Sequence, residues 1–161
     1  MAVFLVLVAL LQSPWDIAKG AAGKASTQKL EQSINKRLLA ESRKNQCSFK
    51  TDTDVLEKGC DKKLRNLVNA LVSAKKQLDS AHVQNFKFEV SGHTDTSGSA
   101  AHNKELSLKR AEVIVKELIT RGVPHDEIVA VGRGSEAPLV KPDNTPAKKA
   151  KNRRYEIRVR L

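Results

Sequence analysis

The stretch Val90-Ser-Gly-His-Thr-Asp-Thr-Ser-Gly98 decides how this chain is organised. Just before it, residues 86–90 alternate apolar and polar side chains, which is the period of a half-buried strand. Residues 92–98 are rich in Gly, Ser and Thr and are predicted to form a loop. Asp95 is therefore expected just past the end of a strand, where glycines let the backbone approach a ligand closely.

Apolar periodicity on both sides of this loop predicts a mixed fold. Residues 61–80 and 103–120 are predicted helices, and residues 46–50, 128–131 and 155–161 are predicted strands. Two helices separated by strands indicate an α/β (α+β) sandwich with the helices packed on one face of the sheet. The apolar faces expected to be buried are Leu64, Leu67, Val68, Leu71, Val72 and Leu78 in the first helix and Leu106, Ala111, Ile114, Val115 and Leu118 in the second.

Asp95 has a candidate partner in Arg110, which lies about two turns into the second helix. A carboxylate and a guanidinium on adjacent elements can recognise a zwitterion, because the carboxylate binds an ammonium group and the planar guanidinium binds a carboxylate bidentately. From the spacing alone, an internal Asp95–Arg110 salt bridge is the favoured interpretation, and a site for a zwitterion is the alternative.

Several motifs follow one another in order along this part of the chain. They are Gly92-His-Thr-Asp95, Asn103, Leu106-Ser107, Arg110-Ala111, Gly132 to Glu136 with Pro138, and Asn152-Arg-Arg154. Together they resemble the signature of the OmpA-like C-terminal domain family, the peptidoglycan-binding module shared with MotB-type stator subunits and peptidoglycan-associated lipoproteins. The resemblance covers residues 46–161.

This resemblance implies both a fold and a ligand. The fold is a βαβαβ domain with the helices on one face of a mixed sheet. The ligand is the diaminopimelate of the peptidoglycan stem peptide, whose side-chain end is a zwitterion. By resemblance, Asp95 binds its ammonium group and Arg110 binds its carboxylate, while Thr94, Asn103 and Arg154 help to shape the pocket. The resemblance therefore favours a binding site over a structural salt bridge.

The first 45 residues divide into two predicted segments. Residues 1–23 are expected to be a hydrophobic membrane segment or signal/anchor, since Met1 to Leu11 are uncharged and almost all apolar. That run is shorter than the roughly 20 residues of a spanning helix, so it fits an imperfect export signal or the back half of a membrane helix. Residues 24–45 are a predicted helical linker, either a solvated spacer or a two-chain coiled coil through Leu30, Ile34 and Leu38.

Composition restricts the partners. The chain has 161 residues and a formal net charge of +11, which indicates an acidic partner such as nucleic acid, anionic lipid or an acidic polymer. Aromatic residues are only 4%, which argues against single-stranded nucleic-acid binding by base stacking. No nucleic-acid partner is expected, although basic residues gather near the C-terminus: Lys148, Lys149, Lys151, Arg153, Arg154, Arg158 and Arg160.

The remaining reactive residues have alternative interpretations. Cys47 and Cys60 either form a disulfide in an oxidising compartment or stay as buried thiols. His93, Asp95 and His102 are the types of residue that bind zinc, but within the family this His is a motif residue without a metal, so no metal or cofactor is expected. Ser91, His93 and Asp95 show no nucleophile elbow or oxyanion hole, so the chain is not expected to be an enzyme.

We therefore expect a non-catalytic module that binds peptidoglycan and anchors a membrane-tethered protein to the cell wall. The expected location is the periplasm of a Gram-negative-type envelope, with the inner membrane favoured for the anchor. The alternative is a force-bearing, MotB-like stator subunit of an ion-driven motor or secretion complex. A homodimer and a membrane partner subunit would accompany that role. Ion conduction needs an ionisable aspartate in the membrane helix, and Met1 to Leu11 contain none.

Overall fold

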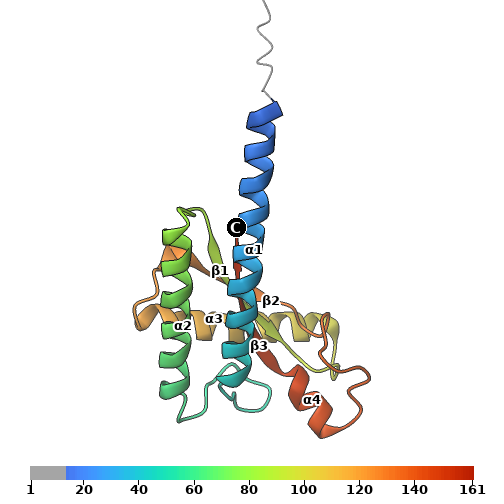
Figure 1. Ribbon diagram of the computed structural model, residues 1–161. Coiled ribbons are helices and arrows are strands. Elements are labelled where there is room, and N and C mark those ends of the chain that lie inside the picture. The colour runs from blue at the N-terminus through green and yellow to red at the C-terminus, as the bar shows by residue number, and fades with distance from the viewer. Residues whose placement is uncertain (1–13) are drawn as a thin grey trace, which may run out of the picture.

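The computed structural model describes residues 14–161, with side chains from residue 23. Figure 1 shows the long first helix extending away from the sheet and the other helices. The helices and strands are α1 (Pro14–Lys44), α2 (Asp61–Ser80), β1 (Lys87–His93), α3 (Ala100–Thr120), a 3-10 turn at His125–Glu127, β2 (Ile128–Gly132), α4 (Pro146–Asn152) and β3 (Arg154–Arg160).

The three strands form one mixed sheet in the order β2-β1-β3. β1 pairs parallel to β2, with Gly92 opposite Gly132, and antiparallel to β3, with His93 opposite Arg154. The outer edge of β3 is capped by α1 and the residues after it. Asn35 exchanges two side-chain hydrogen bonds with the backbone of Val159, and Gln46 does the same with Tyr155. These amides satisfy backbone groups that an open sheet edge would expose.

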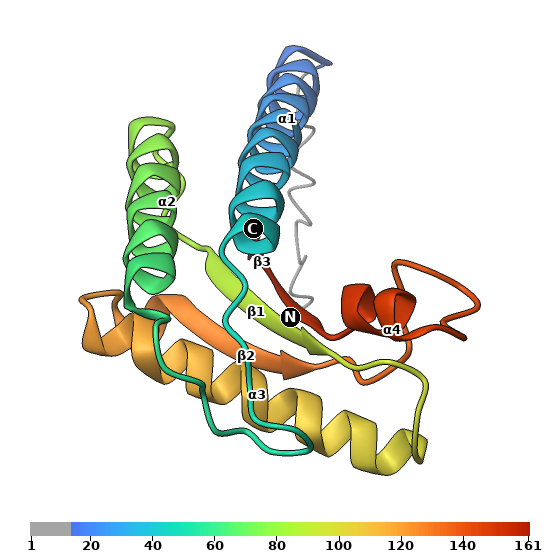
Figure 2. The same ribbon diagram turned by 90° about the horizontal axis from the view of Figure 1, so that it is seen from below.

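Figure 2 shows helices α1, α2 and α3 arranged around the sheet. One cluster of buried apolar side chains joins these helices to the sheet. Phe88 and Val90 of β1 and Ile157 and Val159 of β3 are all buried in it. The expected mixed sandwich with helices on one face of a mixed sheet is confirmed. The α2 prediction is also confirmed in its bounds, whereas Val72 is 45% exposed and was wrongly placed in the core.

The apolar side chains proposed as the interface of a two-chain coiled coil lie inside the domain. Ile34 and Leu38 are 1% and 2% exposed and belong to the core, and Leu30 packs against it. Residues 30–44 of α1 are therefore part of the folded unit, and this face is not available to a second chain. The prediction of dimerisation through these three leucine and isoleucine side chains is wrong.

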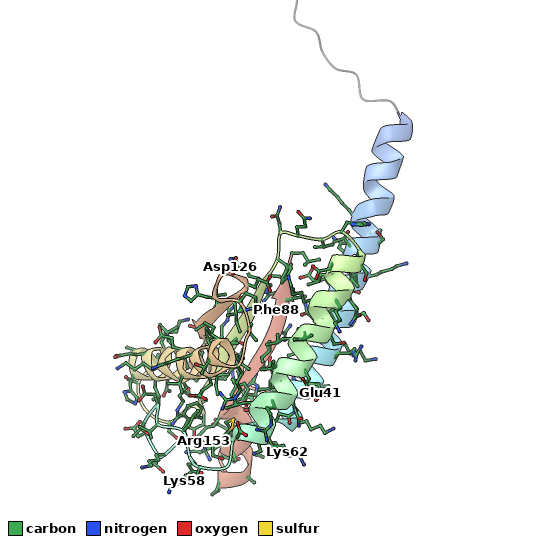
Figure 3. All side chains as sticks on the ribbon, turned by 90° about the vertical axis from the view of Figure 1, so that its left-hand side faces the viewer. Glu41, Lys58, Lys62, Phe88, Asp126 and Arg153 are labelled. Atoms are coloured by element: carbon green, nitrogen blue, oxygen red, sulfur yellow. A yellow bond between two sulfur atoms is a disulfide. The ribbon has the colours of Figure 1, made fainter. Side chains whose placement is uncertain are left out.

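The segment 46–60 is held to the domain by covalent and side-chain contacts. The predicted strand at 46–50 is reduced to one isolated bridge between Phe49 and Leu56, so the first β element of the βαβαβ pattern is almost lost. Cys47 and Cys60 form a disulfide with a Cα–Cα distance of 5.6 Å, drawn in yellow in Figure 3. The segment 46–60 is therefore a loop closed by the disulfide, and Asp52 and Thr53 in its middle contact α3.

Two glycines let α3 lie directly on the sheet. A Cβ on Gly92 of β1 would overlap the carbonyl oxygen of Ser107, and one on Gly132 of β2 would lie 2.6 Å from the carbonyl oxygen of Lys104. The same contact is reinforced where the backbone N–H of Gly134 donates to Ser107 Oγ at 2.8 Å. The glycines of the motif thus set how close α3 comes to the end of β1.

Replacing Gly92 with Ala is expected to lower the free energy of unfolding by about 2 kcal/mol, because the obstructing atoms are backbone and cannot rotate away. Urea denaturation measures this loss. Gly23→Ala is the matched control, since nothing lies within 4 Å of a Cβ at that exposed helical position. An unchanged unfolding midpoint for Gly92→Ala would contradict the close packing of α3.

The N-terminal prediction falls largely on residues that are not described. Residues 1–13 of the expected membrane segment 1–23 lie outside the described part of the chain. Between residues 14 and 161, no helix combines the length and the apolar character needed to cross a membrane. Two short helical elements were not predicted: α4 and the 3-10 turn before β2.

Candidate functional site

The loop after β1 is fixed from two sides. The backbone N–H of Thr94 donates to the carbonyl of Gly134 at 2.9 Å, which joins the loop to the segment after β2. The Asn103 side chain, buried in the first turns of α3, donates to the carbonyl of Ser97 at 2.9 Å and to that of Asp95 at 3.3 Å. Residues 94–97 therefore have a defined position between α3 and the β2–α4 connection.

The Asp95 carboxylate lies in this loop, and its side chain is 12% exposed. Its Oδ1 accepts a hydrogen bond from the Ser97 N–H at 2.9 Å, and its Oδ2 accepts one from Arg153 Nη1 at 2.8 Å. Burial raises the pKa of Asp95, but the hydrogen bonds from Arg153 and Ser97 outweigh burial and hold it below its ordinary value. Asp95 is therefore ionised at neutral pH, and two of its roughly four acceptor positions are used.

Arg110 is held by the tethered segment 46–60. Its Nε donates to the carbonyl of Thr53 at 2.8 Å, and its guanidinium lies 5.1 Å from the centre of the Phe49 ring. Within residues 23–161, no hydrogen bond or ion pair reaches its two terminal nitrogens. Burial lowers the pKa of Arg110, while the charges of Asp52, Asp54 and Asp95 act in the opposite direction. Asp95 is thus electrostatically coupled to Arg110, yet the two form no salt bridge.

Thr94 adds an unsatisfied polar atom to the same site. Its side chain is 5% exposed, and its Oγ1 has no hydrogen-bond partner in the described structure. A buried hydroxyl without a partner costs free energy unless a water or ligand satisfies it. An ionised carboxylate, an oriented guanidinium and an unpaired hydroxyl are the groups needed to bind a small zwitterion.

A second layer of contacts supports the loop from the β2–α4 connection. The Asp143 carboxylate accepts a hydrogen bond from the Thr96 N–H at 2.9 Å, a second one from the Thr96 hydroxyl, and a third from Asn152 Nδ2 at 3.0 Å. From α4, Lys149 Nζ donates to Ser97 Oγ at 2.7 Å. The end of α4 also delivers Arg153 to Asp95, so α4 is a structural part of the site.

The hydrogen bonds to Asp143 predict an acid-sensitive loop. Hydrogen bonds from Thr96 and Asn152 lower the pKa of Asp143 from 3.8 to about 2. A lowered pKa means that this carboxylate stabilises the folded loop above pH 4 and loses that contribution as the pH falls toward 2. The amide resonance of Thr96 is expected to titrate with a midpoint of about 2 and to lose this titration in Asp143→Asn. A midpoint near 4 would contradict these contacts.

The structure places three of the five predicted site residues, Asp95, Thr94 and Asn103, in or against one loop. Arg110 lies further along α3, where it contacts Thr53 and is influenced by the charge of Asp95. Arg154 is not brought to them. Its guanidinium donates to Glu156 Oε1 at 2.9 Å and to the carbonyl of Ala137 at 3.0 Å, on the opposite face of the sheet. Its neighbour Arg153 is the residue that reaches Asp95.

Arg153 and Asp143 are among the contributors to the site that sequence reasoning missed. Arg153 was part of the Asn152-Arg-Arg154 motif, but two consecutive arginines at the start of a strand point to opposite faces, and spacing does not tell which one faces the loop. Asp143 lies in an irregular stretch between Gly132 and Pro146, where no periodicity marks it. The only available signal was a carboxylate among the lysines between Lys141 and Lys151.

The metal and catalytic constellations do not assemble around Asp95. His102 Nε2 lies 2.9 Å from Asp52 Oδ1, and His93 Nε2 lies 3.3 Å from Ser91 Oγ. Among residues 23–161, no cluster of three or more His, Cys, Asp or Glu side chains has the geometry to hold a metal ion. Ser91 and His93 contact each other, but the carboxylate of Asp95 is bonded to Arg153 and not to His93.

Comparison with known proteins identifies a family. Residues 48–153, about two thirds of the chain, match the model of the OmpA family. A 68-residue stretch is 44% identical to the peptidoglycan-binding protein ArfA of Mycobacterium bovis, and it covers 42% of this chain. It spans only 21% of ArfA, so the likeness concerns one part of that protein.

Two solved structures have a similar fold. The peptidoglycan-associated lipoprotein from Burkholderia pseudomallei superposes with a TM-score of 0.58 at 24% identity, covering 71% of this chain and 89% of that one. The C-terminal domain of Helicobacter pylori MotB superposes with a TM-score of 0.54 at 22% identity, covering 72% of this chain and 84% of that one. At these identities the likeness concerns the fold alone.

Proposed function

Because the chain belongs to the OmpA family, we propose that it binds peptidoglycan without turnover and anchors a membrane-tethered protein to the cell wall. One observation carries the proposal. The guanidinium of Arg110 is oriented by Thr53 and Phe49, while no group of residues 23–161 bonds its terminal nitrogens, and its electrostatic neighbour Asp95 is ionised. Such a pair is suited to a ligand that carries a positive and a negative group at the same end.

Diaminopimelate is the ligand that this chemistry fits. The side-chain end of this amino acid carries an ammonium group and a carboxylate on one carbon. In the proposed complex, the ammonium group binds Asp95 and the carboxylate binds the free edge of the Arg110 guanidinium bidentately. The unpaired Oγ1 of Thr94 supplies a further hydrogen bond. Asn103 acts through the loop, since its amide holds the carbonyls of Asp95 and Ser97.

Arg153 has a separate role in this proposal. Its side chain is 45% exposed and bonds Asp95 Oδ2, so it keeps the carboxylate ionised and aligned before the ligand arrives. The remaining acceptor positions of Asp95 are free for the ligand ammonium group. Arg153 is therefore a positioning residue, and Arg110 is the residue proposed to contact the ligand carboxylate.

Sedimentation with purified diaminopimelate-containing cell wall tests the proposal. Arg110→Gln is expected to weaken binding about tenfold, because the ligand carboxylate loses a charged, bidentate donor. Arg65→Gln is the matched control, since it removes the same charge from the exposed surface of α2. Equal sedimentation of Arg110→Gln and the wild type would overturn the role of Arg110.

The anchoring part of the proposal rests on α1. This helix has 31 residues and would span roughly 45 Å at 1.5 Å per residue, and its first half extends beyond the sheet (Figure 1). We assign residues 24–29 of that half to a spacer between the wall-binding domain and the proposed membrane segment or signal/anchor at residues 1–23, in the periplasm with the inner membrane favoured. The stator alternative needs an ionisable aspartate in a membrane helix, and Met1 to Leu11 contain none. The structure of residues 1–13 lies outside the described part of the chain.

A further inference from the structure

The sheet face opposite the core carries a polar groove that wall binding does not use. The side chains of Glu89, Ser91 and His93 on β1 and of Arg154, Glu156 and Arg158 on β3 line it. Its volume is about 580 Å³, and Ala137, Pro138 and Leu139 form one lip. Arg154 lines this groove, whereas Asp95 bonds to Arg153, so the groove is separate from the Asp95 site.

The groove is strongly cationic. Five arginines line it against two glutamates that they contact. Glu156 accepts hydrogen bonds from Arg43, Arg154 and Arg158. Burial raises the pKa of Glu156, but the hydrogen bonds from Arg154 and Arg43 and the charge of Arg154 outweigh burial and lower it to about 2, so Glu156 is ionised. Glu89 pairs with Arg133 at 3.0 Å and with Arg160 at 3.7 Å. A third carboxylate at the rim, Glu136, is bound to Lys104.

These arginines still have donors to offer. Each guanidinium carries five N–H groups. The two carboxylates that these arginines contact cannot accept hydrogen bonds from all the N–H groups of five guanidiniums. Arg133 and Arg158 have side chains that are 38% and 39% exposed, so their remaining donors are open to a ligand. The groove therefore has an excess of positive charge and unused bidentate donors, and it suits carboxylate groups.

His93 gives an independent indication of a ligand. Its side chain is 6% exposed and lines the groove, and its Nδ1 has no hydrogen-bond partner in the described structure. Burial and the nearby Arg154 lower the pKa of His93 to about 4, so the ring is neutral at pH 7. A buried ring nitrogen without a partner is costly, and a ligand atom at this position would satisfy it.

Exposed aliphatic side chains beside the groove indicate which kind of ligand it binds. Leu139 on the lip is 45% exposed, and Val129 of β2, which pairs with Glu89 and so lies on this face, is 40% exposed. Carboxylate sites beside exposed aliphatic side chains match a peptide that carries both acidic and apolar residues. Ser91 and His93 lie at the bottom of a groove, where a flat bilayer surface does not reach.

We propose that this groove is a docking site for an acidic segment of a partner protein, whose carboxylates bind Arg133 and Arg158 and whose apolar side chains rest on Val129 and Leu139. This goes beyond peptidoglycan binding, because it gives the chain a second, independent partner. The wall-binding residues Asp95 and Arg110 take no part in it.

Fluorescence anisotropy of the full chain with a labelled peptide of alternating Glu and Val residues tests the proposal at fixed, near-physiological salt. The double variant Arg133→Gln/Arg158→Gln is expected to bind this peptide at least tenfold more weakly than the wild type. The control Lys62→Gln/Arg65→Gln removes two charges from exposed positions on α2 and is expected to change the affinity less than twofold. Cell-wall sedimentation of the groove variant is expected to match the wild type, which separates this test from that of wall binding.

Three results would overturn the proposal: no saturable binding of the acidic peptide, equal losses in the groove and control variants, or binding to phosphatidylglycerol vesicles without binding to the peptide. NMR adds a direct readout. The ring resonances of His93 are expected to shift when the peptide binds, and unchanged resonances at saturation would place the peptide elsewhere.

Discussion

Replacing Asp95 with Asn is expected to weaken the binding of a diaminopimelate stem peptide by about 30-fold or more, which corresponds to roughly 2 kcal/mol. The substitution keeps the volume, and the remaining oxygen can still accept the hydrogen bond from the Ser97 N–H. It removes the charge that binds the ligand ammonium group, and it leaves Arg153 without its carboxylate partner. Calorimetric titration of the wild type and the variant measures the loss.

A matched control separates this effect from a general loss of negative charge. Asp126 is exposed in the 3-10 turn before β2, and Figure 3 shows it well apart from Arg153. Asp126→Asn is expected to bind the stem peptide as the wild type does. Wild-type affinity in Asp95→Asn, with its circular dichroism spectrum unchanged, would show that Asp95 does not contact the ligand.

Removing the disulfide with Cys47→Ser/Cys60→Ser is expected to lower the free energy of unfolding by about 3 kcal/mol, because the cross-link restricts the unfolded chain. Removing the disulfide is also expected to affect the binding site. The disulfide ties down the segment that supplies the carbonyl of Thr53 and the ring of Phe49 to Arg110. The double variant is therefore expected to bind cell wall more weakly. Urea denaturation and wall sedimentation measure the two effects.

Reduction of the wild type provides the control. Dithiothreitol is expected to destabilise the wild type by the same amount as the double substitution and to leave the double variant unchanged. Equal stability of the wild-type chain with and without reductant would contradict the disulfide as a source of stability.

The sequence predicts best the elements whose apolar pattern is long. The α2 prediction is correct in its bounds because five buried side chains recur at helical spacing over 20 residues. The predicted strand at 46–50 was wrong, because so short an alternation of apolar and polar residues also fits a segment that is not part of a sheet. The Cys47 N–H donates to Tyr155 Oη at 3.1 Å, and the disulfide holds the segment in place, so no sheet partner is needed.

The candidate site is predictable only where a motif fixes it. Asp95 and Arg110 lie on adjacent elements as expected, but their spacing does not show that Asp95 is paired with Arg153. α4 was missed because its lysine and alanine residues have no apolar period, although Pro146 and the capping Thr145 mark its start. Residues 30–44 of α1 were assigned to a linker because an amphipathic stripe looks the same whether a second chain or the same domain covers it.

The most direct test of the proposed binding mode is a four-way calorimetric titration. It uses the wild type and Arg110→Gln, each with a stem peptide whose diaminopimelate side-chain carboxylate is either free or amidated. If Arg110 binds that carboxylate, amidation weakens the wild type about tenfold and makes no further difference in Arg110→Gln, because both changes remove the same interaction. Equal losses on amidation in both proteins would contradict the contact between Arg110 and the diaminopimelate carboxylate.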